Sequence, residues 1–464
     1  MDMPGQIMPD HTVSSLDTLV QNIAGTRSLA TGLALTRARN AFLDTLACCV
    51  AGAMDPVTER VFQAVRPSGE GICSLAARAD FMSAEAAALV NGTAAHALDF
   101  DDNFNPAVTH ASAILVPCLL ALGQETDASG QMLLDAYIIG LEVQAWLGRR
   151  MIPAHYEAGW HATSTIGTIG AAGACARLLG LPPNCIRAAL SIASSMASGS
   201  KSQFGTMVKP LHVGLAARNG ITAARLAASG ITGINDPFSG DWGFIKLHHG
   251  EDIHPRELRG DAVEALAIIS DGLAQKKFPC CASAHRTMDA VIELMEKHVL
   301  NAEDIELIET VVPEYDYRNM RYKQPDNEME ARFSMNYCAA VVALYGRMSL
   351  DDFSNIAVAR PDVRKWLTKV SMRLNKSDDV QTKAYWEEPA ITTLFLKDGR
   401  RLQKEVYQPV GTIHHPLSNQ ELADKYWSCV NKSLEKLKAE MLYRHITNME
   451  NESARDLGIY VRKG

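Results

Sequence analysis

The chain has 464 residues, of which 47% are hydrophobic and 21% charged, and its formal net charge is -8. A chain of this length and composition can bury more than one hydrophobic core, so we expect two globular domains. The acidic balance, without any block of basic residues, argues against nucleic acid and anionic membrane surfaces as partners. No apolar run approaches the roughly 18 residues that span a bilayer, and the first fifteen residues do not resemble a signal peptide, so the sequence predicts a cytoplasmic protein.

From the N-terminus to about residue 270 the sequence is typical of packed helices. Apolar residues recur at intervals of three and four, for example in "LTRARNAFLDTLACCVAGA", "SAEAAALVNGTAAHAL" and "LHVGLAARNGITAARLAASG". The high content of alanine, glycine and serine lets neighbouring helices approach closely. This part predicts a large all-helical domain.

After "QKKFPCCASAHR" the pattern changes to that of an α+β domain. The segments "IELIETVVPEY", "KVSMRLN" and "AITTLFLKDGRRLQKEVY" alternate apolar and polar residues, and "KDGR" indicates a hairpin turn. Between them lie the helical patterns "MEARFSMNYCAAVVALYG" and "DVRKWLTKV", and a last helical pattern starts at "SNQELADKYW". We therefore predict a mainly α protein with an α+β part: a helical domain built from residues 1–270 and 400–464, and an inserted α+β domain over residues 271–399.

The stretch "AHALDFDDNFNPAVTHAS", from Ala95 to Ser112, combines three aspartates and two histidines between apolar helical runs. Charged groups at such a place need partners or a chemical role. The simplest interpretation is structural: the aspartates cap the next helix, and His96 is an interior histidine. A magnesium site is a second interpretation, because "DDNFN" and "NDPFS" approximate the metal boxes of helical terpene synthases, but Gly243 stands where the second box needs a glutamate and Pro237 interrupts its helix.

A third interpretation is general acid–base chemistry on a carboxylate substrate, which needs a proton carrier and cations that hold the carboxylates. The rest of the chain offers these groups. His161 precedes a small-residue helix start in "GWHATSTIGT", Lys209 and His212 share "VKPLHVG", and Lys276 lies at the domain junction in "KKFPCC". No cysteine or histidine spacing predicts a metal site, so we expect no metal.

Taken together and in this order, the motifs "NGTAAHALDFDD", "THASA", "GWHATSTIGT", "VKPLHVGLAARNG", "KKFPCC" and "EARFSMNYCAA" resemble the MmgE/PrpD family over roughly residues 15–440. That family includes 2-methylcitrate dehydratase, cis-aconitate decarboxylase and iminodisuccinate epimerase. The resemblance implies a helical domain built from both chain ends, an inserted α+β lid domain, a homodimer, and no metal or organic cofactor.

The resemblance also implies site residues. The matching positions are expected to be catalytic at Asp99, His110, His161 and Lys209, and substrate-binding at Lys276, His212 and Tyr317. We also expect Asn103 and Arg218 to bind the substrate. Tyr315 matches the family's lid tyrosine as well as Tyr317 does. Where the dehydratase and decarboxylase branches resemble "DFDDTxH", this chain has Asn103 and Asn105, whose amides cannot transfer a proton, and a loop one residue longer.

From this resemblance we predict a cofactor-independent lyase, a dehydratase or a decarboxylase, acting on a small di- or tricarboxylate of the methylcitrate or aconitate type. The shared chemistry is proton transfer at a carbon next to a carboxylate. Two alternatives remain open: an epimerase of an iminodisuccinate-like dicarboxylate, and a non-catalytic helical binding protein, which the two asparagines favour.

Overall fold

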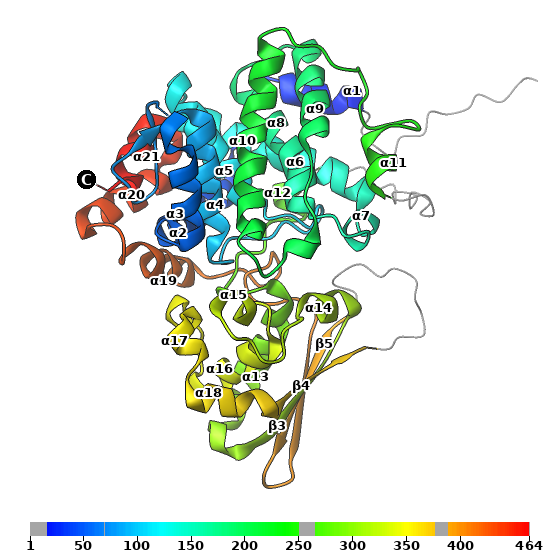
Figure 1. Ribbon diagram of the computed structural model, residues 1–464, viewed down its shortest axis with the longest axis vertical. Coiled ribbons are helices and arrows are strands. Elements are labelled where there is room, and N and C mark those ends of the chain that lie inside the picture. Colours follow the sequence, from blue (N-terminus) through cyan, green and yellow to red (C-terminus); the bar gives the residue numbers. More distant parts are fainter. Residues whose placement is uncertain (1–15, 69, 250–264, 376–387, 464) are drawn as a thin grey trace, which may run out of the picture.

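The computed structural model describes residues 16–68, 70–249, 265–375 and 388–463. The N-terminal segment, where the sequence predicts no signal peptide, lies outside them. The described chain forms two units, a helical one and a smaller α+β one (Figure 1). Within the described ranges, no single helix is long and apolar enough to cross a membrane, although one pair of helices bent by 85° would pass the same test together.

The helical unit contains the first helices of the chain and the last three. Its longer elements are α1 (Leu16–Ala24), α2 (Gly32–Gly52), α3 (Pro56–Val65), α4 (Ala84–Ala97), α5 (Ala111–Thr126), α6 (Gly130–Met151), α8 (Ala162–Leu178), α9 (Pro183–Met196), α10 (Val208–Ala228), α19 (Asn419–Val430), α20 (Lys436–Thr447) and α21 (Ala454–Val461). Shorter ones are α7 (Ala154–Glu157), α11 (Phe244–His249), α12 (Ala267–Ser270) and a two-stranded ribbon, β1 (Cys73–Ser74) with β2 (Phe81–Met82). One hydrophobic core joins residues from both ends of the chain, as predicted.

Small residues let α4 and α10 cross in contact, which positions part of the site. A Cβ atom on Gly92 would meet the Cα of Gly214 at 3.0 Å, and one on Gly214 would meet the Leu89 carbonyl oxygen at 2.2 Å. Because neither glycine has a side chain, the two helices approach backbone to backbone. The start of α10, with Lys209, therefore lies beside the end of α4, with His96.

The smaller unit is a four-stranded sheet covered by helices, and it has its own core. Its strands are β3 (Ile305–Val312), β4 (Val370–Leu374), β5 (Ala390–Leu396) and β6 (Arg401–Val406), in the order β4-β3-β5-β6. β3 and β4 are parallel, and the other pairs are antiparallel. The helices are α13 (His285–His298), α14 (Glu314–Asn319), α15 (Glu328–Ala331), α16 (Met335–Tyr345), α17 (Asn355–Val358) and α18 (Pro361–Trp366).

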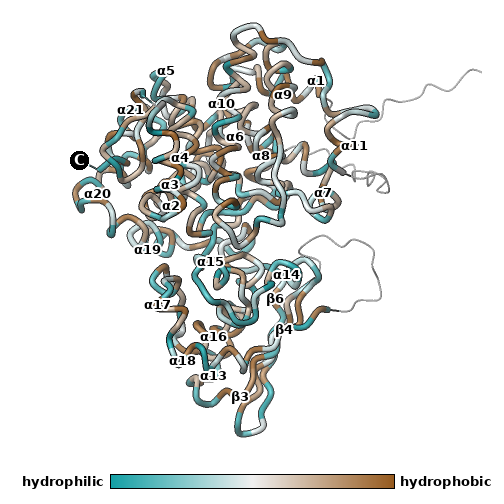
Figure 2. The backbone as a smooth tube through the Cα atoms, in the orientation of Figure 1, coloured by the Kyte–Doolittle hydropathy of each residue, from teal (hydrophilic) through white to brown (hydrophobic). Residues whose placement is uncertain are grey.

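The fold class is the predicted one, a mainly α protein with an inserted α+β part. Figure 2 shows hydrophobic segments inside the helical unit and along the sheet. The expected boundary at residue 399 falls inside the β5–β6 hairpin, at Gly399 with φ +88°. Because β6 pairs with β5, the α+β unit extends to at least Val406, and the chain then returns to the helical unit.

Candidate active site

A cavity of about 520 Å³ lies where the two units meet. Its lining comes from the loop that follows α4, the first turns of α8 and α10, the connector over residues 270–285, the lid helices and the returning segment 408–414. The predicted site residues on its lining are Asp99, Asn103, His110, His161, Lys209 and Lys276. Segments far apart in the sequence thus bring most of the predicted site together.

Asp99 holds two buried ammonium groups. Its Oδ1 lies 2.9 Å from Lys209 Nζ and 3.0 Å from Lys276 Nζ, and Lys276 also donates to the Asp99 carbonyl at 2.8 Å. Burial raises the pKa of Asp99, but the two lysines outweigh it and hold the pKa well below its usual range. Burial lowers the pKa of Lys276, but Asp99 and Asp101 outweigh it and raise this pKa. The centre is therefore charged, with one carboxylate between two cations.

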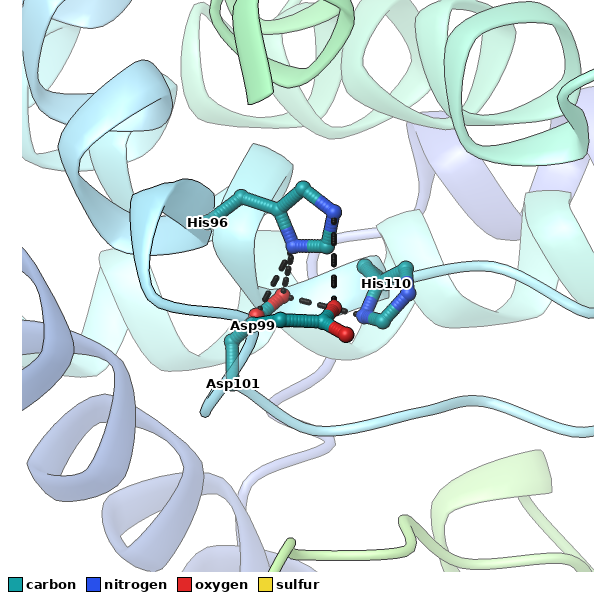
Figure 3. A group of neighbouring side chains, drawn as sticks. All are labelled: His96, Asp99, Asp101 and His110. Carbon is teal, nitrogen blue, oxygen red and sulfur yellow. Dashed lines mark hydrogen bonds and ion pairs between the residues drawn. The ribbon is translucent and has the colours of Figure 1, made fainter. Parts of the chain in front are cut away.

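Asp101, which the sequence analysis did not select, connects two histidines (Figure 3). His96 Nδ1 lies 2.8 Å from Asp101 Oδ1, and His110 Nδ1 lies 3.1 Å from Asp101 Oδ2. Burial lowers the pKa of His96 to about 3, so this ring is neutral. Its Nδ1–H donates to Asp101, which leaves Nε2 to accept a hydrogen bond from Lys209 Nζ at 2.6 Å.

His110 lies at the start of α5, as its N-cap residue. Its Nδ1 also lies 3.0 Å from the Asp102 carbonyl oxygen, so Nδ1 carries the proton and Nε2 is the basic nitrogen. Burial lowers the pKa of His110, although Asp101 opposes this. Asp101 therefore orients both histidines, whereas Asp99 binds the two lysines.

Asp102 caps α5 from a fully buried position. It accepts hydrogen bonds from the Ser112 backbone N–H at 3.3 Å and from the Ser112 hydroxyl. Burial raises the pKa of Asp102 to about 7, although Ser112 opposes the shift. Thr109, just before α5, donates its hydroxyl to Gln144 Oε1 at 2.6 Å and does not cap the helix. The structural interpretation of the acidic cluster therefore holds for Asp102, which caps α5, and for His96, which is an interior histidine with partners on both ring nitrogens.

His161 begins α8 and contacts His212 of α10. The two Nδ1 atoms are 3.0 Å apart. Burial, together with the Lys209 charge, lowers the pKa of both rings, that of His161 to well below its usual range. His161 lines the cavity, whereas His212 is outside the set of lining residues and reaches the site through His161.

Aromatic rings enclose the Lys209 ammonium. Its Nζ lies 5.4 Å from the ring centroids of both Phe204 and Phe333, and the Phe204 ring packs edge-on against His161 at 5.0 Å. These rings exclude water from one side of the charged centre, which strengthens charge pairs formed there.

Two predicted substrate-binding residues lie elsewhere. Tyr317 is 38% exposed, whereas Tyr315 lines the cavity, so the other register of the lid tyrosine is the one that faces the site. Arg218 is outside the lining, and its guanidinium donates to Asn219 Oδ1 at 3.1 Å. α10 carries Arg218 away from Lys209, since the two residues are more than two turns apart.

Other lining residues had no signal in the sequence, and these are Cys281, Ser283, Asn319, Gln408, Thr412 and His414. Single polar residues in loops and very short helices have no periodicity that could reveal them. His285, near the junction lysines, also lines the cavity, and burial lowers its pKa to about 3.

Four of these side chains, His96, Asp99, Asp101 and His110, place ligand atoms within 4.8 Å of one another. The donor set does not fit a divalent cation, because Asp99 Oδ1 and His96 Nε2 already accept from ammonium groups that such an ion would displace. Asp236, from the second candidate magnesium box, accepts from the Phe238 and Ser239 backbone N–H groups within its own loop. The terpene-synthase interpretation is therefore wrong.

Comparison with known proteins gives two family matches and a consistent group of relatives. Residues 19–256 match the MmgE/PrpD N-terminal domain, and residues 278–451 match the MmgE/PrpD C-terminal domain. The chain is 32% identical to the cis-aconitate decarboxylase of Homo sapiens over 379 residues, which cover 79% of this chain and 76% of the relative. It is 31% identical to that of Mus musculus over 90% of this chain and 86% of the relative, and 26% identical to that of Aspergillus terreus over 84% of each.

Proposed function

Because the chain belongs to the MmgE/PrpD family, we propose that it is a lyase that removes carbon dioxide from a tricarboxylate of the cis-aconitate type. The observation that carries this proposal is the convergence of two ammonium groups and two neutral histidines on one cavity. The similarity to cis-aconitate decarboxylases supports the same reaction.

The lysines have the geometry to bind substrate carboxylates. An ammonium group has three N–H donors. Among the described residues, Lys209 uses two of them on Asp99 and His96, and Lys276 uses two on the carbonyl and carboxylate of Asp99. One donor on each lysine is thus available to a carboxylate oxygen, in a site where burial and aromatic rings strengthen the pairing.

The reaction then requires one proton. When the bond to the leaving carboxylate breaks, its electron pair forms a new carbon–carbon double bond. The pair of the former double bond moves to the carbon beside a second carboxylate, and this carbon takes up a proton. A trianion and a proton thus give a dianion and carbon dioxide, without an oxidant or a cofactor.

His110 and His161 are the proton carriers in this proposal, since both line the cavity. Their pKa values are lowered by burial and by neighbouring lysine charges, so they are neutral before substrate binds. The negative charge of a bound tricarboxylate raises those pKa values and lets one ring hold the proton that the carbon receives. The amides of Asn103 and Asn105 cannot supply this proton, which leaves that role to the two histidines.

The test is proton NMR in deuterium oxide with citrate, 2-methylcitrate, cis-aconitate and iminodisuccinate, together with a carbon dioxide assay. The proposal predicts loss of carbon dioxide from cis-aconitate and one deuterium in the product, on the carbon beside a carboxylate. Loss of water from citrate or 2-methylcitrate would identify a dehydratase. Exchange of a proton in iminodisuccinate with no change of carbon skeleton would identify an epimerase, and no reaction with any of the four would favour a binding protein.

A further inference from the structure

One side of the cavity is apolar, and the chemistry of a small tricarboxylate does not account for it. We call it the apolar wall, and it consists of Pro106, Val108, Ile152, Leu273, Val410 and Ile413. Each of these side chains is half-buried and lines the cavity. They come from the loop before α5, the end of α6, the connector and the returning segment.

These segments are joined to one another, so the apolar wall is continuous. Asn103 and Ala274 exchange backbone hydrogen bonds of 2.9 and 2.8 Å, and Gln275 N–H donates to the Gly411 carbonyl at 2.9 Å. A Cβ atom on Gly272 would lie 3.1 Å from Ile413, and one on Gly148 would lie 2.2 Å from the Pro106 carbonyl oxygen. The loop, the connector, the returning segment and the end of α6 therefore pack as one surface.

Val108 is held on this wall at a backbone cost. Its φ is +53°, in the left-handed region that glycine and asparagine tolerate and β-branched residues avoid. Such a conformation is strained and is typical of functional sites. A glycine at position 108 would remove this backbone strain, but it would also remove the apolar side chain that faces the cavity.

Three of the polar side chains close to the wall have protein partners. Asp271 forms an ion pair with Arg149 at 2.8 Å. Gln275 donates to the Asn40 carbonyl at 3.2 Å, and Thr412 donates to the Pro409 carbonyl at 3.0 Å. These groups do not require a polar ligand, so the surface favours an apolar one.

The cavity is also large for an unsubstituted substrate. Cavities of ~300–1,000 Å³ hold drug-sized ligands, and this one measures about 520 Å³. cis-Aconitate has only about twelve non-hydrogen atoms, and the charged centre around Asp99 binds its carboxylates at one side. Along the chain, Lys276 of that centre is three residues from Leu273 and the neighbouring His110 is two residues from Val108, so the apolar wall begins beside it.

We propose that the preferred substrate is a polycarboxylate with an aliphatic chain of several carbons, and that this chain lies along the apolar wall. The inference rests on the proposed lyase function for the position of the carboxylates. Burial of a methylene group contributes about 0.8 kcal/mol, which corresponds to about a four-fold gain per added carbon.

The test uses cis-aconitate and its methyl, ethyl, propyl and butyl derivatives, substituted in one series on the methylene carbon and in another on the vinylic carbon. We expect kcat/KM to rise about four-fold per carbon in at least one series. A flat or falling dependence in both series would overturn the inference and leave the lyase function intact. Binding of propane-1,2,3-tricarboxylate and its alkyl derivatives, measured by calorimetry, tests the wall even if nothing is turned over, because Kd should fall by the same factor per carbon.

Two variants locate the chain. Val108→Gly removes the side chain and relieves the backbone, so the protein should fold normally while the butyl-to-unsubstituted ratio falls about ten-fold. Ile413→Ala should lower the same ratio, and its matched control is Ile356→Ala, on an isoleucine that is 85% exposed in α17. An unchanged ratio in both wall variants would mean that the aliphatic chain of the substrate lies elsewhere, and would refute the assignment.

Discussion

The Nδ1 atoms of His161, at the start of α8, and His212, in α10, lie 3.0 Å apart. Only one nitrogen of such a pair can carry the shared proton, so the two rings must adopt complementary tautomers. His161 lines the cavity and His212 does not. Because Nδ1 of His161 faces His212, the proton shared by this pair determines whether Nε2 of His161 is a donor or an acceptor.

We expect His212→Phe to lower kcat about 10- to 100-fold with little change in KM, because the ring of His161 loses the partner that fixes its tautomer. His212→Asn should recover part of the activity, since an asparagine amide can replace Nδ1 as a hydrogen-bonding group. Steady-state kinetics across pH would check both variants. A raised KM with unchanged kcat would instead restore the direct substrate contact that the sequence predicted.

Lys209→Ala should reduce kcat/KM at least ~100-fold, the scale of a desolvated charge-assisted contact. The variant removes one of the two cations on Asp99 and one donor to substrate. The matched control is Lys277→Ala. Lys277 is next to Lys276 in the sequence, but its ammonium lies 3.8 Å from Asp289 and it is outside the cavity lining. Equal losses in both variants would mean that general charge, and not the position of Lys209, controls the rate.

The fold could largely be predicted from the sequence because its signals are periodic. Helical spacing before residue 270, alternation in the segments that became β3 to β6, and the "KDGR" turn all have local causes. The boundary at residue 399 divides the β5–β6 hairpin, although the "KDGR" turn itself predicts that these two strands pair.

The roles within the acidic cluster could not be predicted. Asp99 has φ +51°, so the backbone reverses there and turns Asp99 toward the lysines and Asp101 toward the histidines. Two carboxylates only two residues apart therefore have different partners. Similarly, Tyr315 and Tyr317 lie on opposite sides of α14, since two helical residues are about 200° apart, and only the packing of α14 selects Tyr315.

Activity should survive treatment with EDTA. The candidate ligand atoms on Asp99 and His96 accept from Lys209 and Lys276, so two ammonium groups supply the positive charge that a metal ion would bring. Initial rates before and after chelation, with metal content measured in parallel, provide the check. Loss of activity in EDTA that magnesium restores would require these lysines to leave the centre.

His110→Gln should abolish turnover and leave the fold intact, because an amide cannot hold and release the proton. Asp101→Asn should also lower kcat, by ~10- to 100-fold, since it weakens the hydrogen bonds that fix His96 and His110. Asp102→Asn should leave kcat within a few-fold, because its side chain caps α5. Circular dichroism and steady-state kinetics would separate the three. Similar losses in the Asp101 and Asp102 variants would contradict this division of roles.

Asp102→Asn should stabilise the protein, and more so at high pH. Burial raises the pKa of Asp102 from 3.8 to about 7. Between these values the unfolded state releases a proton that the folded state retains, so this group contributes stability at low pH that is lost as the pH rises to about 7. The gain in free energy of unfolding from Asp102→Asn should then be about 3 kcal/mol larger at pH 8 than at pH 5.

Urea unfolding of the unsubstituted protein and of the Asp102→Asn variant, each at pH 5 and pH 8, measures this difference. Glu142 and Asp289, whose pKa values burial raises to about 7 and about 6, titrate in the same range but cancel between the two proteins. Asp424→Asn, at an exposed aspartate, serves as the control with no pH-dependent gain. A gain from Asp102→Asn that is equal at pH 5 and pH 8 would mean that Asp102 is already ionised in the fold, and that its hydrogen bonds to Ser112 outweigh the cost of burial.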